Sequence, residues 1–309
     1  MSLHRVLPIA ALLVSSLLAT GNASAHEPAD IAPITCDSCA DWNRAHAPFR
    51  LHGGSYYVGV DGLGAVLIDT GDGLVLLDGG LPQSAPVIAD HIRALGFRPE
   101  DVRWIGMSHP HFDHAGGIAA LVRMSGNRAI VLATQAGADA LRAGNAPADD
   151  PQAGFGDEMK FPAVHTRIRV MADGETLKAG ATTLRLIATP GHAPGGSSWS
   201  WQSCDGGKCL DLVYADSLNP VSAPGFRFGP PDGARVKQFQ ASIDRVAALP
   251  CDILVSAHPG VSQLFERQNR GQIVDASACR VYAENARTRL QQRLAEEAAA
   301  PAAPGKDQR

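Results

Sequence analysis

Residues 108–117 read Ser108-His109-Pro110-His111-Phe112-Asp113-His114-Ala115-Gly116-Gly117, and four side chains able to bind a metal lie within six of these residues. This stretch follows an apolar segment, residues 102–107, that predicts a β-strand, and it precedes a Gly-led segment that predicts a short helix. In an irregular loop after a strand, His109 and His111 can face one ion while Asp113 and His114 face a second. Imidazole and carboxylate without thiolate form a ligand set that suits zinc. The segment therefore predicts a metal centre that needs further ligands from elsewhere.

Two further histidines have the setting expected of such ligands. His192 follows the predicted strand 182–188 within Thr189-Pro190-Gly191-His192, and His258 follows the predicted strand 253–256 within Ser256-Ala257-His258-Pro259-Gly260. Functional side chains collect on loops at the ends of scaffold strands. A lone His is more often structural, but six such side chains together predict metal binding. The other histidines lack this setting and are expected to be structural: His26, His46, His52, His91 and His165.

Around these motifs, short apolar strands alternate with segments of helical periodicity. Predicted strands cover residues 56–60, 65–69, 74–78, 102–107, 129–133, 167–171, 182–188, 197–202, 210–215 and 253–256. Predicted helices cover residues 84–95, 117–124, a segment after 134, 233–249 and 277–299, with a loop over 144–162. Two β-then-α halves without a linker between them predict an α/β fold, a four-layer αβ/βα sandwich of two mixed β-sheets flanked by helices.

Composition places the chain among ordinary globular proteins. Of its 309 residues 45% are hydrophobic and 19% are charged, and the net charge is −4. Because there is no basic field to attract phosphate backbones, nucleic-acid binding is not expected. Nothing in the sequence indicates an interface between copies, so a monomer is expected.

The first 25 residues have the pattern of a secretory signal peptide. An apolar run follows Arg5 and leads to Ala23-Ser24-Ala25, after which cleavage is expected. The run is shorter than the ~20 residues of a membrane-spanning helix. We therefore expect an exported, periplasmic protein with no membrane insertion after cleavage. The expected organisation is a removed signal peptide (1–25), an N-terminal arm (26–54), a single catalytic domain (55–299) and a flexible tail (300–309).

Six cysteines in an exported chain make disulfides plausible, although six allow 15 pairings. Cys204 and Cys209 flank Asp205-Gly206-Gly207-Lys208, a hairpin-turn composition, and could close a small loop. Cys36 and Cys39 form a C-x-x-C that fits a local disulfide better than a redox motif or half a zinc site, because no second C-x-x-C accompanies it. Cys251 and Cys279 remain, and could form a disulfide between residues farther apart in the sequence.

Taken together, His-x-His-x-Asp-His with His192 and His258 resembles the metallo-β-lactamase superfamily over residues 42–290. The chain is most similar to β-lactamases of subclass B3. The features that carry this likeness are the signal peptide, Trp42-Asn43, Pro48-Phe49-Arg50 ahead of Tyr56-Tyr57-Val58-Gly59, Tyr214-Ala215-Asp216-Ser217, and the Cys251/Cys279 pair. Ser217 stands where other subclasses place a Cys ligand.

The resemblance implies a cofactor of two Zn²⁺ ions. It assigns His109, His111 and His192 to the first zinc and Asp113, His114 and His258 to the second, with a hydroxide bridging the two ions. Zinc lowers the pKa of bound water to about 7, which supplies a nucleophile at neutral pH. Asp113 and His192 are the residues to which we assign catalytic roles, and Asp113 is expected both to ligate and to orient the nucleophile.

Four further positions have two interpretations each. Asp216 either bridges the metals, as in superfamily members outside the lactamases, or supports a ligand from behind. Asp78 either braces the metal-binding loop or is a turn residue. Ser217 and Asn219 either bind the substrate carboxylate or are ordinary loop residues. The Pro- and Gly-rich loop 219–231 could form an apolar wall of the cleft.

The function that the resemblance implies is zinc-dependent hydrolysis of β-lactams (penicillins, cephalosporins and carbapenems), conferring antibiotic resistance. The alternative is an exported di-zinc hydrolase of a lactone or thioester on the same fold, because related proteins use much the same ligands. A zinc-sequestering protein is a third possibility, but the pattern leaves coordination positions for water. Serine-based hydrolysis is disfavoured because neither S-x-x-K nor G-x-S-x-G occurs in the chain.

Overall fold

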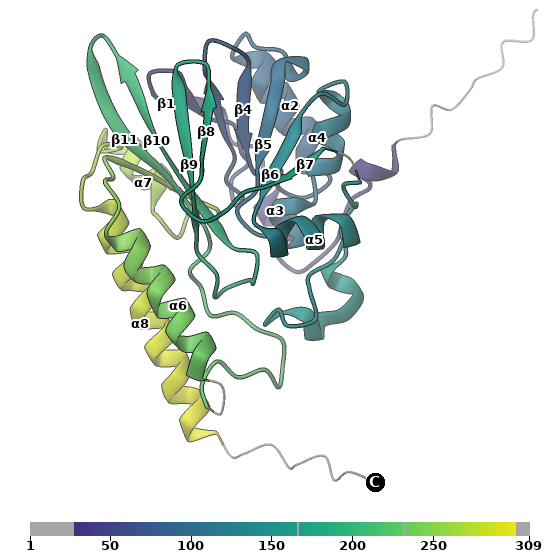
Figure 1. Cartoon of the computed structure of the whole chain (residues 1–309), viewed down its shortest axis with the longest axis vertical. Helices are drawn as coiled ribbons and strands as arrows, with labels where there is room; N and C mark the ends of the chain where they lie inside the picture. Colours follow the sequence, from purple (N-terminus) through teal and green to yellow (C-terminus); the bar gives the residue numbers. More distant parts are fainter. Residues whose placement is uncertain (1–27, 166, 231–232, 301–309) are drawn as a thin grey trace, which may run out of the picture.

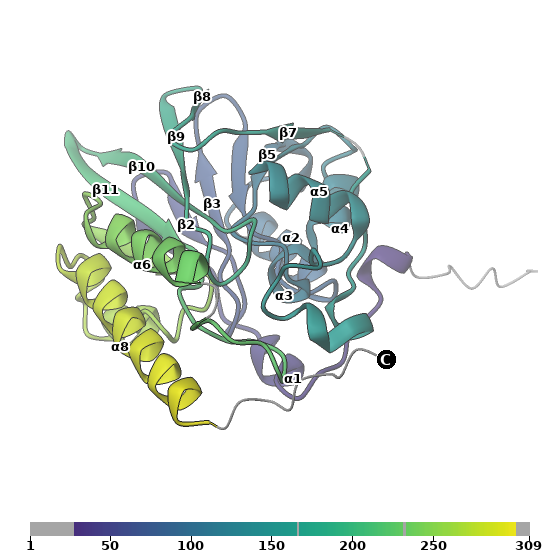
Figure 2. The same cartoon turned by 60° about the horizontal axis from the view of Figure 1, so that its bottom comes forward.

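Two β-sheets pack face to face in the computed structural model, which describes residues 28–165, 167–230 and 233–300. Helices lie outside both sheets, so the layers run helix, sheet, sheet, helix (Figures 1 and 2). This arrangement confirms the four-layer αβ/βα sandwich. The predicted signal peptide, residues 301–309 of the predicted tail and His26 lie outside the described residues.

The first sheet has seven strands in sequence order. They are β1 (Phe49–His52), β2 (Ser55–Tyr57), β3 (Val66–Asp69), β4 (Leu74–Leu77), β5 (Val102–Gly106), β6 (Ile130–Ala133) and β7 (Ile168–Val170). Neighbouring strands are antiparallel from β1 to β4 and parallel from β4 to β7. Apolar side chains cover both faces of the central strands, as a sheet buried on both sides requires.

The second sheet has five strands in the order β12-β11-β10-β9-β8. They are β8 (Thr176–Ala179), β9 (Thr182–Ala188), β10 (Ser197–Asp205), β11 (Lys208–Ala215) and β12 (Ile253–Ser256). The pairing of β11 with β12 is parallel and the other pairings are antiparallel. Both sheets are therefore mixed, as the sequence predicts.

Helices cover the outer faces. On the first sheet they are α2 (Ser84–Ala94), α3 (Phe112–Ala115), α4 (Ile118–Met124) and α5 (Gln135–Ala143). On the second sheet they are α6 (Gly233–Ala247) and α8 (Ala278–Ala299), which lie side by side in both views (Figures 1 and 2). Trp199, Trp201 and Tyr214 fill the space between the sheets and are at most 4% exposed. Burial of these large side chains is a major favourable contribution to folding.

Several elements differ from the sequence-based expectation. β1 belongs to the first sheet although its residues lie in the predicted arm. Other elements were not predicted, among them β8, the helix α1 (Cys39–Trp42), the helix α7 (Leu264–Asn269) and α3, which turns the expected irregular loop into one helical turn. Each of these is six residues long or less, so none spans enough residues to show a clear periodicity.

Three disulfides are present, and they confirm the expected pairs: Cys36–Cys39, Cys204–Cys209 and Cys251–Cys279. The C-x-x-C is therefore a local crosslink beside the one-turn helix α1 (Cys39–Trp42). Cys251–Cys279 joins the segment before β12 to the start of α8. Among the described residues, every helix is too short or too polar to cross a membrane.

Candidate active site

The candidate site lies where strand ends from both sheets meet. The loop after β5 carries His109 and His111, the loop after β9 carries His192, and the loop after β12 carries His258. Ser197 Oγ and Trp199 Nε1 of β10 donate to the carbonyl of Met107 at 2.7 and 3.1 Å. These bonds attach the loop from the first sheet to the second sheet, so both sheets position the same set of side chains.

The first donor group consists of His109, His111 and His192. One ring nitrogen of each lies within 4.8 Å of the others, and all three residues are buried. Nε2 of His109 is buried and has no hydrogen-bond partner. A buried nitrogen without a partner is costly unless something binds it. The three rings therefore turn nitrogen atoms toward one another in a way that suits a shared metal ion.

The second donor group consists of Asp113, His114 and His258. Asp113 Oδ2 lies 3.2 Å from His114 Nε2 and 3.4 Å from His258 Nε2, and the two ring nitrogens are 3.2 Å apart. His109 also falls within 4.8 Å of the donor atoms of Asp113 and His114. The two donor groups are therefore adjacent, with His109 between them, and all six sequence-predicted ligands are brought together.

Four of the five imidazoles form a hydrogen bond with an oxygen atom behind the ring, and the fifth, His114, has a carboxylate oxygen at 3.4 Å. The contacts are His109 Nδ1 with Asp216 Oδ1 at 2.8 Å, His111 Nε2 with Asp150 Oδ2 at 3.0 Å, His114 Nδ1 with Asp78 Oδ2 at 3.4 Å, His192 Nδ1 with the carbonyl of Asn219 at 2.7 Å, and His258 Nδ1 with the carbonyl of Gly62 at 3.0 Å. Such partners fix the orientation of a histidine ligand and the ring nitrogen that it presents.

Electrostatics keep two rings of the first group, His109 and His192, neutral. Burial, reinforced by the neighbouring imidazoles, lowers the pKa of His109 well below its ordinary value. Burial and His111 lower the pKa of His192 to about 3. Both rings thus keep a free lone pair at neutral pH, which is the form that binds metals.

The second group instead attracts positive charge. Burial by itself would lower the pKa of His114, but the charge of Asp113 and the hydrogen bonds to Asp113 and Asp78 raise it to about 10. The pKa of Asp113 is held well below its ordinary value, because His114 and His258 outweigh the effect of burial. The negative charge of Asp113 and Asp78 that favours a proton on His114 also favours a metal ion, which takes the place of that proton when it binds. With five imidazoles, one carboxylate and a buried nitrogen without a partner, the two groups fit metal ions.

Asp78 and Asp216 both lie behind the ligand rings. Asp78, at φ 62°, accepts from Ser108 N and Ser108 Oγ, both at 2.6 Å, and from the Tyr214 hydroxyl at 2.7 Å. This geometry fastens the loop 108–114 to the end of β4. Asp216 contacts His109 Nδ1, opposite the nitrogen that faces the first group, and burial raises its pKa well above the ordinary value.

A cleft of about 180 Å³ opens over the donor groups. Ser217 and Asn219 line it, as do Trp42 and Gln152. The Trp42 ring lies 5.3 Å from the ring of His258. Trp42 thus brings the N-terminal segment to the cleft.

Asp150 and Gln152 are the residues at this site that the sequence analysis missed. Both lie in the loop 144–162, and their only signal was an Asp-Asp-Pro turn in a polar stretch. The remaining described histidines lie outside the two donor groups: His46 stacks on Phe265, His52 and His91 contact backbone carbonyls, and His165 is exposed.

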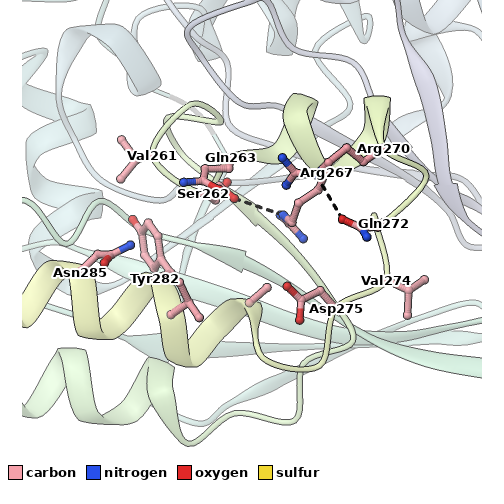
Figure 3. Close-up of a pocket in the computed structure, with 12 residues that line it drawn as sticks. Val261, Ser262, Gln263, Arg267, Arg270, Gln272, Val274, Asp275, Tyr282 and Asn285 are labelled. Atoms are coloured by element: carbon pink, nitrogen blue, oxygen red, sulfur yellow. Dashed lines mark hydrogen bonds between the residues drawn. The ribbon is translucent and has the colours of Figure 1, made fainter.

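A second pocket, of about 380 Å³, lies apart from this cleft between α7 and the start of α8 (Figure 3). Arg267 lines it and is only 5% exposed. Its guanidinium donates to the carbonyls of Leu254, Ser262 and Ile273 at 2.6, 3.2 and 3.3 Å. Arg267 therefore connects β12, the segment after His258 and the segment after α7.

Comparisons with known proteins agree with this geometry. The family model described as metallo-β-lactamase superfamily matches residues 60–258, more than half of the chain. Among solved structures, MEM-A1, a subclass B3 metallo-β-lactamase isolated from a soil metagenome library, is 48% identical with a TM-score of 0.80, covering 84% of this chain and 99% of that one. Rm3 metallo-β-lactamase is 47% identical with a TM-score of 0.81, covering 85% and 99%.

A more distant likeness is to an N-acyl homoserine lactonase from a Bacillus species, 27% identical over 157 residues. That match covers 43% of this chain and only 55% of the lactonase. The B3 structures are matched over nearly their whole length at much higher identity. The chain therefore belongs to the metallo-β-lactamase superfamily and, within it, groups with subclass B3.

Proposed function

We propose that this protein is a zinc-dependent β-lactam hydrolase that acts on penicillins, cephalosporins and carbapenems and thereby confers antibiotic resistance. The observation that carries the proposal is the pair of adjacent donor groups in a chain that matches subclass B3 structures over 99% of their length. The same fold also carries lactonases, so the fold by itself does not decide the substrate.

Zn²⁺ is the cofactor that this donor set suits best, because imidazole and carboxylate ligands without thiolate are typical of catalytic zinc sites. We assign one ion to His109, His111 and His192 and the other to Asp113, His114 and His258. When bound, zinc supplies an activated water near neutral pH and polarises a carbonyl group.

The protein's own side chains then position the substrate. Asp113, whose pKa is well below its ordinary value, stays ionised and is assigned the role of orienting the nucleophile. Ser217 and Asn219 line the cleft beside His192 and are assigned to the carboxylate of the substrate. Holding the lactam carbonyl beside the nucleophile removes much of the entropic barrier to ring opening.

Export to the periplasm, cleavage after Ala25, a catalytic unit spanning residues 55–299 and a monomeric state belong to the same proposal. They are supported by the sequence pattern of residues 1–25 and by three disulfides, which persist in oxidising compartments. The sequence of the expressed protein's N-terminus and its mass in solution would test these assignments.

The decisive experiment measures hydrolysis of a chromogenic cephalosporin and a carbapenem, with and without a strong chelator, while zinc is counted on the same sample. We expect turnover that the chelator abolishes, that added zinc restores and that a mechanism-based serine-lactamase inhibitor leaves intact. Two bound zinc ions without β-lactam turnover would favour hydrolysis of a lactone or thioester.

A further inference from the structure

The loop 144–162, between α5 and β7, places two polar side chains against the first donor group. Asp150 is only 2% exposed, and its Oδ2 lies 3.0 Å from His111 Nε2. Gln152 Nε2 lies 3.3 Å from His111 Nδ1 and 3.5 Å from His192 Nε2. Gln152 therefore lies at the inward-facing nitrogens of His111 and His192, whereas Asp150 lies at the outward-facing nitrogen of His111.

His111 is held differently from the other four imidazoles of the two donor groups. Those four rings have Nδ1 on an oxygen atom and turn Nε2 toward the donor groups, whereas His111 has Nε2 on Asp150 and turns Nδ1 inward. An ionised carboxylate can only accept a hydrogen bond, and a neutral imidazole carries one proton. Asp150 thus requires the proton on Nε2 and leaves the Nδ1 lone pair facing the donor group, where the Gln152 amide lies 3.3 Å away.

We propose that Asp150 is a positioning residue that fixes the tautomer and rotation of His111 and thereby sets the metal affinity of the first donor group. This inference rests on the proposed zinc site. Asp150 acts through His111, because its side chain contacts the outward-facing nitrogen of that ring and the backbone of its own loop. Partners of this kind are worth ~10 to 100-fold in metal affinity in other sites.

The two carboxylate oxygens of Asp150 have separate partners. Oδ1 accepts from the backbone N–H of Gln152 at 2.8 Å, which shapes the turn, while Oδ2 holds His111. The next residue, Pro151, accepts from the N–H of Ala223 at 2.9 Å, which joins the turn to the loop that also carries Asn219. The position of His111 is consequently coupled to both loops at the cleft.

Asp150→Asn tests this arrangement without changing side-chain shape. The amide oxygen can replace only one of the two carboxylate oxygens. If the amide nitrogen faces His111, it donates to Nε2 and forces the proton onto Nδ1, where the metal should bind. If the oxygen faces His111, the bond survives but loses its charge and the turn loses its acceptor. Asp150→Ala removes both contacts.

The experiment titrates the zinc-loaded protein with a competing chelator and measures the affinity of each of the two ions. We expect Asp150→Ala to weaken one ion by ~10 to 100-fold and leave the other unchanged, with Asp150→Asn weakening the same ion less. Nitrogen NMR of the imidazoles after zinc removal should show His111 protonated at Nε2 in the parent protein and that preference lost in Asp150→Ala. The control is Asp149→Asn, at the neighbouring acid, whose side chain is 67% exposed.

Three outcomes separate the inference from the proposed function. Unchanged affinity for both ions in Asp150→Ala would overturn the inference, as would equal weakening of both ions with a matching loss of thermal stability, which is the result of a purely structural role. If Asp150→Ala does not fold, Asp150→Asn decides by the same two criteria. A parent protein that binds no zinc would contradict the proposed function itself.

Discussion

The two donor groups lie side by side, but the surrounding charges and burial shift the pKa values of their histidines in opposite directions. In the first group, three imidazoles meet, and burial lowers the pKa of His109 and His192. In the second group, Asp113 and the nearby Asp78 raise the pKa of His114 to about 10. The first group therefore depends on the placement of lone pairs, whereas the second depends on negative charge that attracts a cation.

Their supports differ as well. The carbonyl of Asn219 holds His192, in a loop that packs against α8. His258 follows β12 and rests on the carbonyl of Gly62 and beside Trp42. Changes in one support should therefore affect one donor group more than the other, which makes the comparison testable.

The largest effect is expected for His192→Ala. Its loss leaves two imidazoles in the first group, so we expect loss of one zinc ion and a fall in kcat/KM on the order of 10³-fold, corresponding to the several kcal/mol that metal catalysis supplies. Zinc stoichiometry and β-lactam hydrolysis on the same sample measure this. His165→Ala, at an exposed histidine, is the control. A folded His192→Ala protein with full zinc content and activity would contradict the assignment of the first group.

A smaller effect is expected for His258→Ala. Its side chain is 24% exposed at the cleft, and Asp113 with His114 retains the negative charge of the second group. We expect weaker binding of one ion and a fall in kcat/KM of ~10 to 100-fold. The measurement is kcat/KM at rising zinc concentration, which should restore part of the activity. A loss as large as that of His192→Ala, with no recovery in zinc, would remove the distinction between the two groups.

Arg267→Ala should destabilise the segment that carries His258. The change leaves the carbonyls of Leu254, Ser262 and Ile273 without their donor, and one unsatisfied buried group costs ~1 to 3 kcal/mol. We expect the free energy of unfolding to fall by ~2 to 4 kcal/mol, measured by denaturant titration. Arg270→Ala, at the exposed arginine of the same pocket, should change it by less than ~0.5 kcal/mol. Equal effects of the two substitutions would show that Arg267 has no special structural role.

The smallest effect is expected at Glu297, which binds the loop that also carries Asn219, the partner of His192. Glu297 of α8 accepts from the N–H groups of Phe228 and Gly229 at 2.9 and 2.8 Å and pairs with Arg293. Burial opposes ionisation of Glu297, but these partners outweigh it and hold the pKa below the ordinary value. Its stabilising contribution is therefore present above pH ~4.5 and is lost as the pH falls through the lowered pKa.

Glu297→Gln should consequently reduce the free energy of unfolding at neutral pH by on the order of 1 kcal/mol, and the difference from the parent protein should shrink as the pH falls toward 3. Thermal or denaturant unfolding at several pH values measures this. Glu296→Gln, at the exposed neighbour, provides the matched control. A difference that grows on acidification would contradict the sign of the pKa shift.

Much of the candidate site could be predicted because its residues follow strands closely in the sequence. His109, His111, Asp113 and His114 form one local motif, and His192 and His258 each follow an apolar strand. Asp150 and Gln152 could not be found in this way. They lie in a stretch without periodicity, and their role depends on how the loop 144–162 folds back over the donor groups.

The residue types and the layers could be read from the sequence: the metal-binding donors and the mixed sandwich. The donors and the layers follow from local chemistry and periodicity, which a linear chain records directly. The three disulfide pairs were expectations among 15 possible pairings until the structure showed them. Only the tertiary structure decided which nitrogen each imidazole presents and which oxygen holds it from behind. Those contacts join residues as far apart as His258 and Gly62, or His109 and Asp216, and no local pattern encodes a partner that the fold brings from more than a hundred residues away.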